Sequence, residues 1–272
     1  PGVHDEPQHK KQGRVMVPML EAMGIPYSVL GADAHHAEPI VKDAVAHVRK
    51  TSGPFAMVIK KGAFAAYVAP PLQQTDLPLS REEAIQQVID VLEERDVVVS
   101  TTGMPSREVY EYRTKKGVGH QRDFLTVGGM GHASQIALGI ALQKPERSVY
   151  CLDGDGALLM HMGALALNGT LKPRNFKHII LNNGAHDSVG GQPTVALDID
   201  ILGIARAAGY AHMASARTQS ELRACLQELK GSLGPSLLEI RVRCGSRKDL
   251  GRPETTPIQN KDAFMDFLAS TG

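Results

Sequence analysis

The residues best suited to chemistry follow two apolar segments in the middle of the chain. The segments span residues 148–152 and 177–181, and they end in Gly154-Asp155-Gly156 and Asn182-Asn183 respectively. Carboxylate, amide and loop carbonyl oxygens are hard ligands that suit Mg²⁺, which keeps part of its shell for water and phosphates. The two glycines allow a bulky anion to approach the backbone, and a following helix offers free N–H groups. This pattern predicts a Mg²⁺–diphosphate site.

An Asp-Gly pair alone is also typical of a simple turn. The amide pair after the next apolar segment favours the metal site. Both segments are apolar enough to be parallel strands buried on both faces, and residues 157–168 between them are rich in Ala, Leu and Met, which favours a helix. The carboxyl ends of neighbouring parallel strands meet at one edge of the sheet, where ligands bind.

Three motifs resemble those of thiamine diphosphate-dependent enzymes. The first is Gly154-Asp155-Gly156 followed at this distance by Asn182-Asn183, a signature of the whole class. The other two are TVGGMGHAS at 126–134 and LNNGAHDSVGGQPT at 181–194. They resemble the phosphonopyruvate decarboxylases and the related sulfopyruvate decarboxylases, and the resemblance extends over most of the chain.

The resemblance implies that Mg²⁺ is bound by the side chains of Asp155 and Asn183 and by the carbonyl oxygen of Ala185. Asn182 is an alternative ligand, because the register of the amide pair is open by one residue. The cofactor itself would contact Gly103, Gly128, Met130, Gly154, Gly156, Ala157 and Asn183. In this interpretation Gly156 and Ala157 hold the diphosphate through their N–H groups, and Met130 supports the bent cofactor.

The activity implied is decarboxylation of a 2-oxo acid, with 3-phosphonopyruvate giving phosphonoacetaldehyde and CO₂. Sulfopyruvate decarboxylation and acetolactate-type carboligation on the same cofactor are alternatives. A third alternative is a subunit or fragment without its own activity, because Glu6, Glu21 and Glu38 do not match the context of the family's cofactor-activating glutamate. In the resembled family the cofactor lies between the pyrimidine domain of one subunit and the diphosphate domain of another, so we expect a homo-oligomer of at least two subunits, or a partner chain that supplies the N-terminal pyrimidine domain.

The candidate catalytic residues are His132, His186 and Asp187. Histidine is suited to proton transfer near neutral pH. His186 and Asp187 directly follow the predicted metal ligands, where a substrate would lie, whereas His132 is equally consistent with a polar helix cap. The anionic group of the substrate has several candidate partners, namely Lys60, Arg107, Arg113 and Arg122.

Composition excludes several other classes of protein. The formal net charge of +1 and the absence of Trp argue against nucleic acid as a partner. No apolar segment is long enough to cross a membrane and no signal peptide is visible, so we expect a cytoplasmic protein. Cys151, Cys225 and Cys244 have no zinc-type spacing and are expected to be small core residues in a reducing compartment. Since Pro1 is not Met, we expect that an N-terminal part is missing.

The predicted fold is α/β, a doubly wound parallel sheet of thiamine diphosphate-binding type preceded by part of a second α/β domain. Residues 1–63 are interpreted as the C-terminal part of a pyrimidine-binding domain, 64–79 as a linker and 80–272 as the diphosphate- and Mg²⁺-binding domain. A Rossmann fingerprint is excluded because Leu159 and Ser134 replace its third glycine. Capping boxes at Ser80 and Thr218 predict two helix starts. The pair His35-His36 is expected to lie on the surface.

Overall fold

The computed structural model describes residues 7–31, 37–67 and 76–270. The chain divides into two compact units, Pro1–Pro70 and Pro71–Gly272. This boundary falls inside the segment predicted to be a linker. The pair His35-His36 lies outside the described residues. Within the described ranges, no helix is long and apolar enough to cross a membrane.

Unit 1 has two helices and a two-stranded parallel sheet in which Tyr27 is in register with Ala56. Its elements are α1 (Pro7–Ala22), β1 (Tyr27–Leu30), α2 (Ala37–Thr51) and β2 (Ala56–Ile59). Helix α1 begins at Pro7. Proline is well tolerated there, since the first turn of a helix needs no N–H donor.

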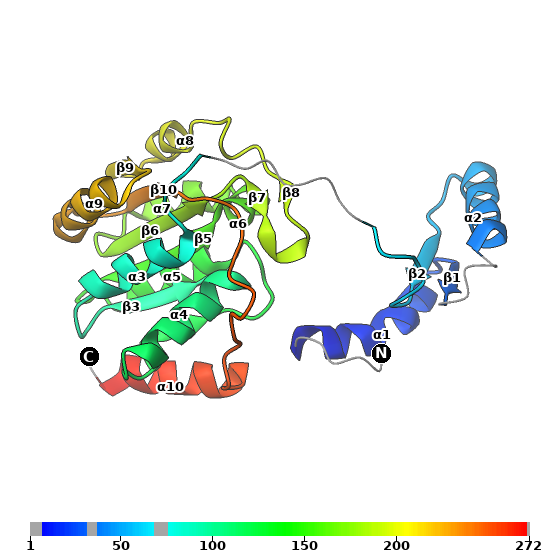
Figure 1. Ribbon diagram of the computed structural model, residues 1–272, viewed down its shortest axis with the longest axis horizontal. Coiled ribbons are helices and arrows are strands. Elements are labelled where there is room, and N and C mark those ends of the chain that lie inside the picture. The colour runs from blue at the N-terminus through cyan, green and yellow to red at the C-terminus, as the bar shows by residue number, and fades with distance from the viewer. Residues whose placement is uncertain (1–6, 32–36, 68–75, 271–272) are drawn as a thin grey trace. The chain divides into compact units, whose positions relative to one another are not determined.

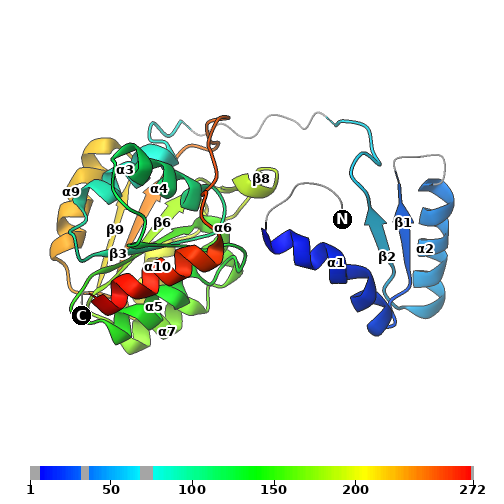
Figure 2. The same ribbon diagram turned by 90° about the horizontal axis from the view of Figure 1, so that it is seen from below.

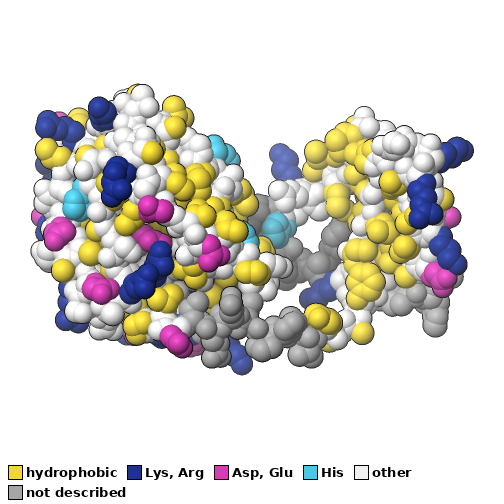
Figure 3. Space-filling view, turned by 90° about the horizontal axis from the view of Figure 1, so that it is seen from above, with side chains coloured by type: hydrophobic (Ala, Val, Ile, Leu, Met, Phe, Trp, Pro, Cys, Tyr) yellow, Lys and Arg dark blue, Asp and Glu magenta, His cyan; other side chains and the backbone are white. Residues whose placement is uncertain are grey.

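This small unit leaves much apolar surface uncovered. Val41, Val45 and Val48 recur along α2, and each is more than 40% exposed. Met57 and Ile59 on β2 are similarly exposed. Figure 3 shows hydrophobic side chains gathered on the exposed surface of the smaller body. A sheet of two strands cannot bury both of its faces by itself, which is why the unit has only a small core.

Unit 2 contains a six-stranded sheet in the order β4-β3-β5-β6-β10-β9, and every pairing in it is parallel. The predicted doubly wound parallel sheet is therefore confirmed (Figure 1). The strands are β3 (Val97–Ser100), β4 (Asp123–Leu125), β5 (Val149–Gly154), β6 (Phe176–Asn182), β9 (His212–Ala216) and β10 (Ser236–Arg241). The helices are α3 (Arg81–Val91), α4 (Met104–Lys115), α5 (Ala133–Gln143), α6 (Asp155–Met160), α7 (Ala164–Leu171), α8 (Ile201–Ala208), α9 (Gln219–Gly231) and α10 (Pro257–Ser270).

Helices cover both faces of this sheet (Figure 2). One apolar core joins α3, α4 and α9 to the sheet, and includes Ile85 and Leu226. The second core joins α5, α7, α8 and α10 to the opposite face, and includes Leu165 and Phe264. Successive residues of each strand alternate between the two cores, as the period of a strand requires. The two predicted capping boxes are present at the starts of α3 and α9.

The segment after β5 differs from the prediction. One helix was expected over residues 157–168, but the structure has α6 and α7 with a turn at residues 161–163 between them. Gly163 stands at the end of this turn, and glycine has low helix propensity. The glycine-rich loop after β6 also has some order, because β7 (Ala185–His186) and β8 (Gln192–Pro193) pair as a short antiparallel ladder around a 3₁₀ turn (Asp187–Val189).

The close packing of α7 against α8 yields a stability prediction. A Cβ added at Gly169 would lie 1.8 Å from the carbonyl oxygen of Ala208, so the two helices would have to separate. We expect Gly169→Ala to lower the free energy of unfolding in urea by about 1–3 kcal/mol. Gly139→Ala on α5 is the matched control, because its Cβ would meet no atom within 4 Å. The control substitution should raise the free energy of unfolding by up to about 1 kcal/mol. Equal effects of the two substitutions would show that the close approach of α7 and α8 does not limit the residue at position 169.

Candidate functional site

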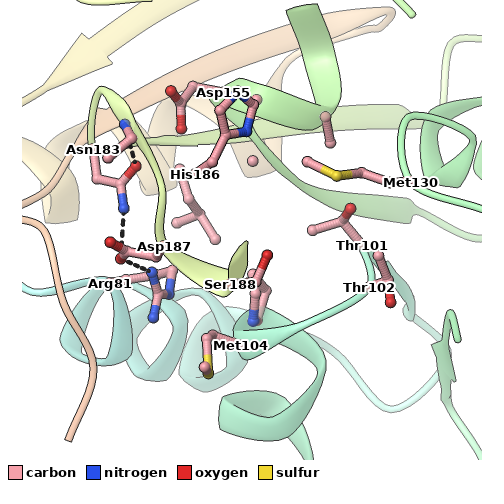
Figure 4. A pocket seen from close by; sticks show the side chains of 16 residues that line it. Arg81, Thr101, Thr102, Met104, Met130, Asp155, Asn183, His186, Asp187 and Ser188 are labelled. Carbon is pink, nitrogen blue, oxygen red and sulfur yellow. Dashed lines mark hydrogen bonds and ion pairs between the residues drawn. The ribbon is translucent and has the colours of Figure 1, made fainter. Parts of the chain in front are cut away.

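A pocket opens at the carboxyl edge of the sheet of unit 2, where β3, β5 and β6 end (Figure 4). It lies beside a switch point, because the chain runs from β3 outward to β4 and then returns to the other side of β3 as β5. Such switch points are the usual ligand sites of open α/β sheets. The predicted site residues that line the pocket are Met130, Gly154, Asp155, Gly156, Ala157, Asn183, Ala185, His186 and Asp187.

Asp155 begins α6 at the end of β5, and its side chain is only 2% exposed. The hydroxyl group of Thr194 donates a hydrogen bond of 2.5 Å to its Oδ2 atom. Burial raises the pKa of the Asp155 carboxyl group above its usual value, because water is withdrawn from the charged form. Arg81 is the one Lys or Arg among the described residues that line the pocket, and it forms ion pairs with Glu108 and Asp187 instead of Asp155. Asp155 thus presents a buried acidic group that a metal ion would neutralise.

The structure separates the two asparagines of the amide pair. Asn183 lines the pocket. Asn182 lies on the other face of β6, where its Nδ2 atom donates to Glu239 Oε1 at 2.7 Å and to the carbonyl oxygen of Ala196 at 3.0 Å. Alternation along the strand causes this separation, since adjacent side chains point to opposite faces. The geometry therefore favours Asn183 over Asn182 as the residue available to a ligand in the pocket.

The carboxylate of Asp187 is held by three donors at one oxygen. Its Oδ2 atom accepts from Arg81 Nη1 at 2.8 Å, from Asn183 Nδ2 at 2.7 Å and from the N–H of Gly245 at 3.0 Å. Figure 4 shows the first two contacts as a chain from Arg81 through Asp187 to Asn183. Because Asn183 donates an amide hydrogen to Asp187, the Oδ1 atom of Asn183 is the part of its side chain that can accept a hydrogen bond or bind a metal. Asp187 therefore orients the side chain of Asn183, and its predicted catalytic role stays a prediction.

Arg81 is itself fixed by Glu108. Its Nε and Nη2 atoms donate to the two carboxylate oxygens of Glu108 at 2.9 and 3.0 Å. Both side chains are buried, and Asp187 is about one-tenth exposed. Burial of an arginine is tolerated where its guanidinium is paired with carboxylates in this way. Sequence reasoning missed this group, because its partners are 27 and 106 residues away along the chain.

His186 packs directly against the glycine of the predicted diphosphate loop. A Cβ added at Gly156 would lie 2.4 Å from His186 Nδ1 and 3.4 Å from Met130 Cε. Only glycine allows the imidazole to approach the start of α6 this closely. Met130 enters the pocket from the opposite wall to Asn183 (Figure 4). The pocket thus combines an imidazole, a flexible apolar side chain and a closely approached backbone.

Three of the predicted site residues do not line this pocket. Gly128 and His132 line a second hollow together with Phe124, Ile136 and Asn260. His132 is exposed, and its ring contacts the ring of His161 edge-on at 4.8 Å between centroids.

Gly103 lies between two residues of the pocket wall. Its φ of 98° favours glycine, and an added Cβ would lie 3.3 Å from Ser188 Cβ.

Two of the arginines proposed for the substrate anion have partners within the fold. Arg113 is buried and donates to both carboxylate oxygens of Asp123 at 3.0 Å. Arg122 donates to the carbonyl oxygen of Glu93 at 2.7 Å. Neither of them lines the pocket, and Arg107 does not line it either.

The buried arginine yields a prediction about stability. Arg81→Met leaves Glu108 and Asp187 without their cation, so we expect the free energy of unfolding in urea to fall by about 3–5 kcal/mol. Arg247→Met is the control, because its ion pairs with Glu82 and Glu111 are about one-third exposed. That substitution should cost at most about 1 kcal/mol. Similar losses in the two variants would show that burial of the Arg81 network does not matter.

Comparison with known proteins agrees with the geometry of the pocket. The profile of the thiamine pyrophosphate enzyme C-terminal TPP-binding domain matches residues 101–240. Phosphonopyruvate decarboxylase of Streptomyces viridochromogenes is 32% identical over 99% of this chain and 70% of its own length. The beta subunit of sulfopyruvate decarboxylase from Methanothermobacter thermautotrophicus is 39% identical over 48% of this chain and 68% of its own length.

A solved structure, benzoylformate decarboxylase from Polynucleobacter necessarius, shares the fold. It superposes with a TM-score of 0.52 at 18% identity, over 65% of this chain and 36% of that chain. The predicted resemblance to phosphonopyruvate and sulfopyruvate decarboxylases is confirmed by these matches. The pocket, the parallel sheet and the matches agree, and the chain belongs to the thiamine diphosphate-dependent decarboxylase family.

Proposed function

We propose that this chain uses thiamine diphosphate and Mg²⁺ to decarboxylate 3-phosphonopyruvate to phosphonoacetaldehyde and CO₂. The observation that carries the proposal is the convergence of Asp155, Asn183 and Ala185 on one pocket at the carboxyl edge of the sheet. The likeness to phosphonopyruvate decarboxylase over nearly the whole chain supports the choice of substrate.

The donor atoms in the pocket fit the proposed metal ion. The Asp155 carboxylate, the Asn183 amide oxygen and the Ala185 carbonyl oxygen are all hard ligands of the kind Mg²⁺ prefers. Asn183 Oδ1 accepts the N–H of Ala185 at 3.0 Å, which uses one of its two lone pairs and leaves the other for a metal. Mg²⁺ would also provide the positive charge that buried Asp155 lacks.

The backbone around α6 fits the proposed cofactor. Gly154, Gly156 and Ala157 line the pocket, and the first N–H groups of a helix have no acceptor within it. We propose that Gly156 and Ala157 hold the diphosphate, with Gly128, Met130 and Gly103 contacting the remainder. When bound, thiamine diphosphate supplies an ylid that serves as the electron sink for loss of CO₂.

The chain's own side chains would act by positioning and by excluding water. Met104, Met130 and Leu181 give the pocket an apolar wall. Such a wall favours a step in which a carboxylate loses its charge as CO₂. His186 is the imidazole placed to hold or move a proton beside the start of α6. Asp187 would keep Asn183 in its metal-binding orientation, and His132 would act only if the second hollow joins the site in the assembled enzyme.

The charge on the substrate requires a cation from outside this pocket. In the described part of the chain, Arg81 is the sole Lys or Arg that lines the pocket, and Glu108 and Asp187 neutralise it. We propose that a second subunit or a partner chain supplies the group that binds the phosphonate, as well as the activating glutamate. The likeness to a sulfopyruvate decarboxylase beta subunit supports a two-chain assembly and keeps sulfopyruvate as the second candidate substrate.

Substitution of Asp155 tests the cofactor site. By calorimetric titration we expect Mg²⁺-dependent binding of thiamine diphosphate to the wild type, weakened more than about 100-fold in Asp155→Asn because a charged ligand is lost. Exposed Asp198→Asn is the control and should bind normally.

The same variant tests the cost of burying the carboxylate. Because burial raises the pKa of Asp155, its ionised form destabilises the metal-free fold at neutral pH. When both proteins are free of metal, Asp155→Asn should therefore unfold at a higher temperature than the wild type. The corresponding gain in the free energy of unfolding should be about 1–2 kcal/mol. A destabilised variant that still binds the cofactor with Mg²⁺ would contradict the proposed site.

Substrate assays test the activity itself. The full chain, assembled with a second subunit or a partner chain, should release aldehyde from phosphonopyruvate with a kcat/KM at least about tenfold above that for pyruvate, a difference of roughly 1.4 kcal/mol. A higher kcat/KM for sulfopyruvate than for phosphonopyruvate would move the assignment to the second candidate. Tight cofactor binding with no turnover of either acid, even in the complete assembly, would identify a subunit that binds the cofactor without catalysis.

A further inference from the structure

Three potential metal ligands meet in the core of unit 2, apart from the pocket described above. They are the thiol of Cys151, the carboxylate of Asp153 and the imidazole of His178, and their ligand atoms all lie within 4.8 Å of one another. Each side chain is at most 1% exposed. None of the three lines the proposed cofactor pocket.

The parallel register of β5 and β6 brings these residues together. Cys151 on β5 is in register with His178 on β6, and Asp153 follows Cys151 by two residues on the same face of the strand. The sheet is buried on both faces here, so neither strand can move its side chains into water. The juxtaposition is therefore built into the backbone of the two strands and needs no flexible loop.

The cluster is electrostatically incomplete by itself. His178 Nε2 is buried with no hydrogen-bond partner among the described residues, and it faces Asp153 Oδ2 at 3.5 Å. The other oxygen of Asp153, Oδ1, accepts the N–H of Gly154 at 3.0 Å. A buried polar atom without a partner costs roughly 1–3 kcal/mol, and a buried carboxylate needs a positive partner.

The surroundings already orient the imidazole. His178 Nδ1 lies 3.0 Å from the hydroxyl oxygen of Tyr210, which accepts from Asn168 Nδ2 at 2.9 Å. Gln135 in turn donates to Asn168 Oδ1 at 2.9 Å. In the tautomer with the proton on Nδ1, His178 donates a hydrogen bond to the hydroxyl oxygen of Tyr210. Its Nε2 atom then presents a lone pair toward Asp153 and Cys151. Second contacts of this kind fix the ring of a metal-bound histidine.

We propose that Cys151, Asp153 and His178 form a buried binding site for a zinc-class divalent cation. Thiolate, imidazole and carboxylate are all zinc ligands, and the soft thiolate disfavours Mg²⁺. A thiolate and a carboxylate together neutralise a doubly charged ion, so the complete site carries no net charge into the core. Binding releases the thiol proton of Cys151. The three side chains leave one position of a tetrahedral ion for a water molecule.

The site would join β5 to β6 directly beneath the cofactor edge. Asp153 lies near the end of β5 and Asp155 begins α6 two residues later, yet they point to different environments. Metal in the core site would hold β5 in register with His178, and so would fix the backbone from which Asp155 enters the pocket. This role is structural, and it does not depend on the proposed decarboxylation.

Metal content and cobalt spectroscopy of the full chain test the proposal. Chain produced with zinc and dialysed against a chelator should retain about one zinc ion per molecule. With Co²⁺ in its place, the thiolate should give an intense charge-transfer band in the near ultraviolet, which an oxygen-only site such as the one at Asp155 cannot give. Absence of both retained zinc and this band in the wild type would overturn the proposal and leave a metal-free polar core.

Variants identify the ligands. Cys151→Ser should abolish the cobalt band, whereas Cys225→Ser on α9, outside the cluster, and Asp155→Asn should keep it. Tyr210→Phe retains the ring and the core volume but removes the contact to His178, so it should weaken zinc binding by about 10–100-fold. A band that persists in Cys151→Ser, or unchanged zinc affinity in Tyr210→Phe, would contradict the assignment even if another core variant failed to fold.

Discussion

Burial of the parallel sheet on both faces is the constraint on which the rest of unit 2 depends. Apolar cores cover each face, so a polar residue within a strand must either reach a strand end or find a partner inside. Both outcomes, a polar residue at the strand end and a polar residue paired in the core, occur within residues 153–155 at the end of β5. Asp155 emerges at the carboxyl edge and faces the pocket, while Asp153 stays in the core beside His178. The site chemistry and the buried cluster are two consequences of one buried strand.

This constraint also explains what could be predicted from the sequence. Apolar runs ending in Gly154-Asp155-Gly156 and Asn182-Asn183 implied adjacent parallel strands, and adjacency brings their ends together without any further information. The choice between Asn182 and Asn183 needed the strand register, because a shift of one residue exchanges the two faces. In the structure Asn182 donates to the carboxylate of Glu239 inside the sheet, which favours Asn183 as the residue that faces the pocket.

Other features had no signal in the sequence. The Arg81 guanidinium links Glu108 on α4 to Asp187 after β7, and only the assembled fold brings those elements together. Its position within a capping box pointed to helix initiation and concealed this role. His132 lies in one of the family-like motifs but lines a second hollow instead of the pocket, so its catalytic role stays a prediction. Motifs locate a backbone segment more securely than they locate its side chains.

The charges of the pocket determine what must be added to it. Glu108, Asp187 and Arg81 form an internal network with one more negative than positive charge, and Asp155 adds a second uncompensated carboxylate. An anionic cofactor or substrate would be repelled by such a pocket in the absence of a cation. The first effect of Mg²⁺ would therefore be to offset the negative charge of the pocket, so that the acidic strand end could bind a diphosphate. A phosphonate would then need a further positive group, which is consistent with the proposal that a second subunit or a partner chain completes the active site.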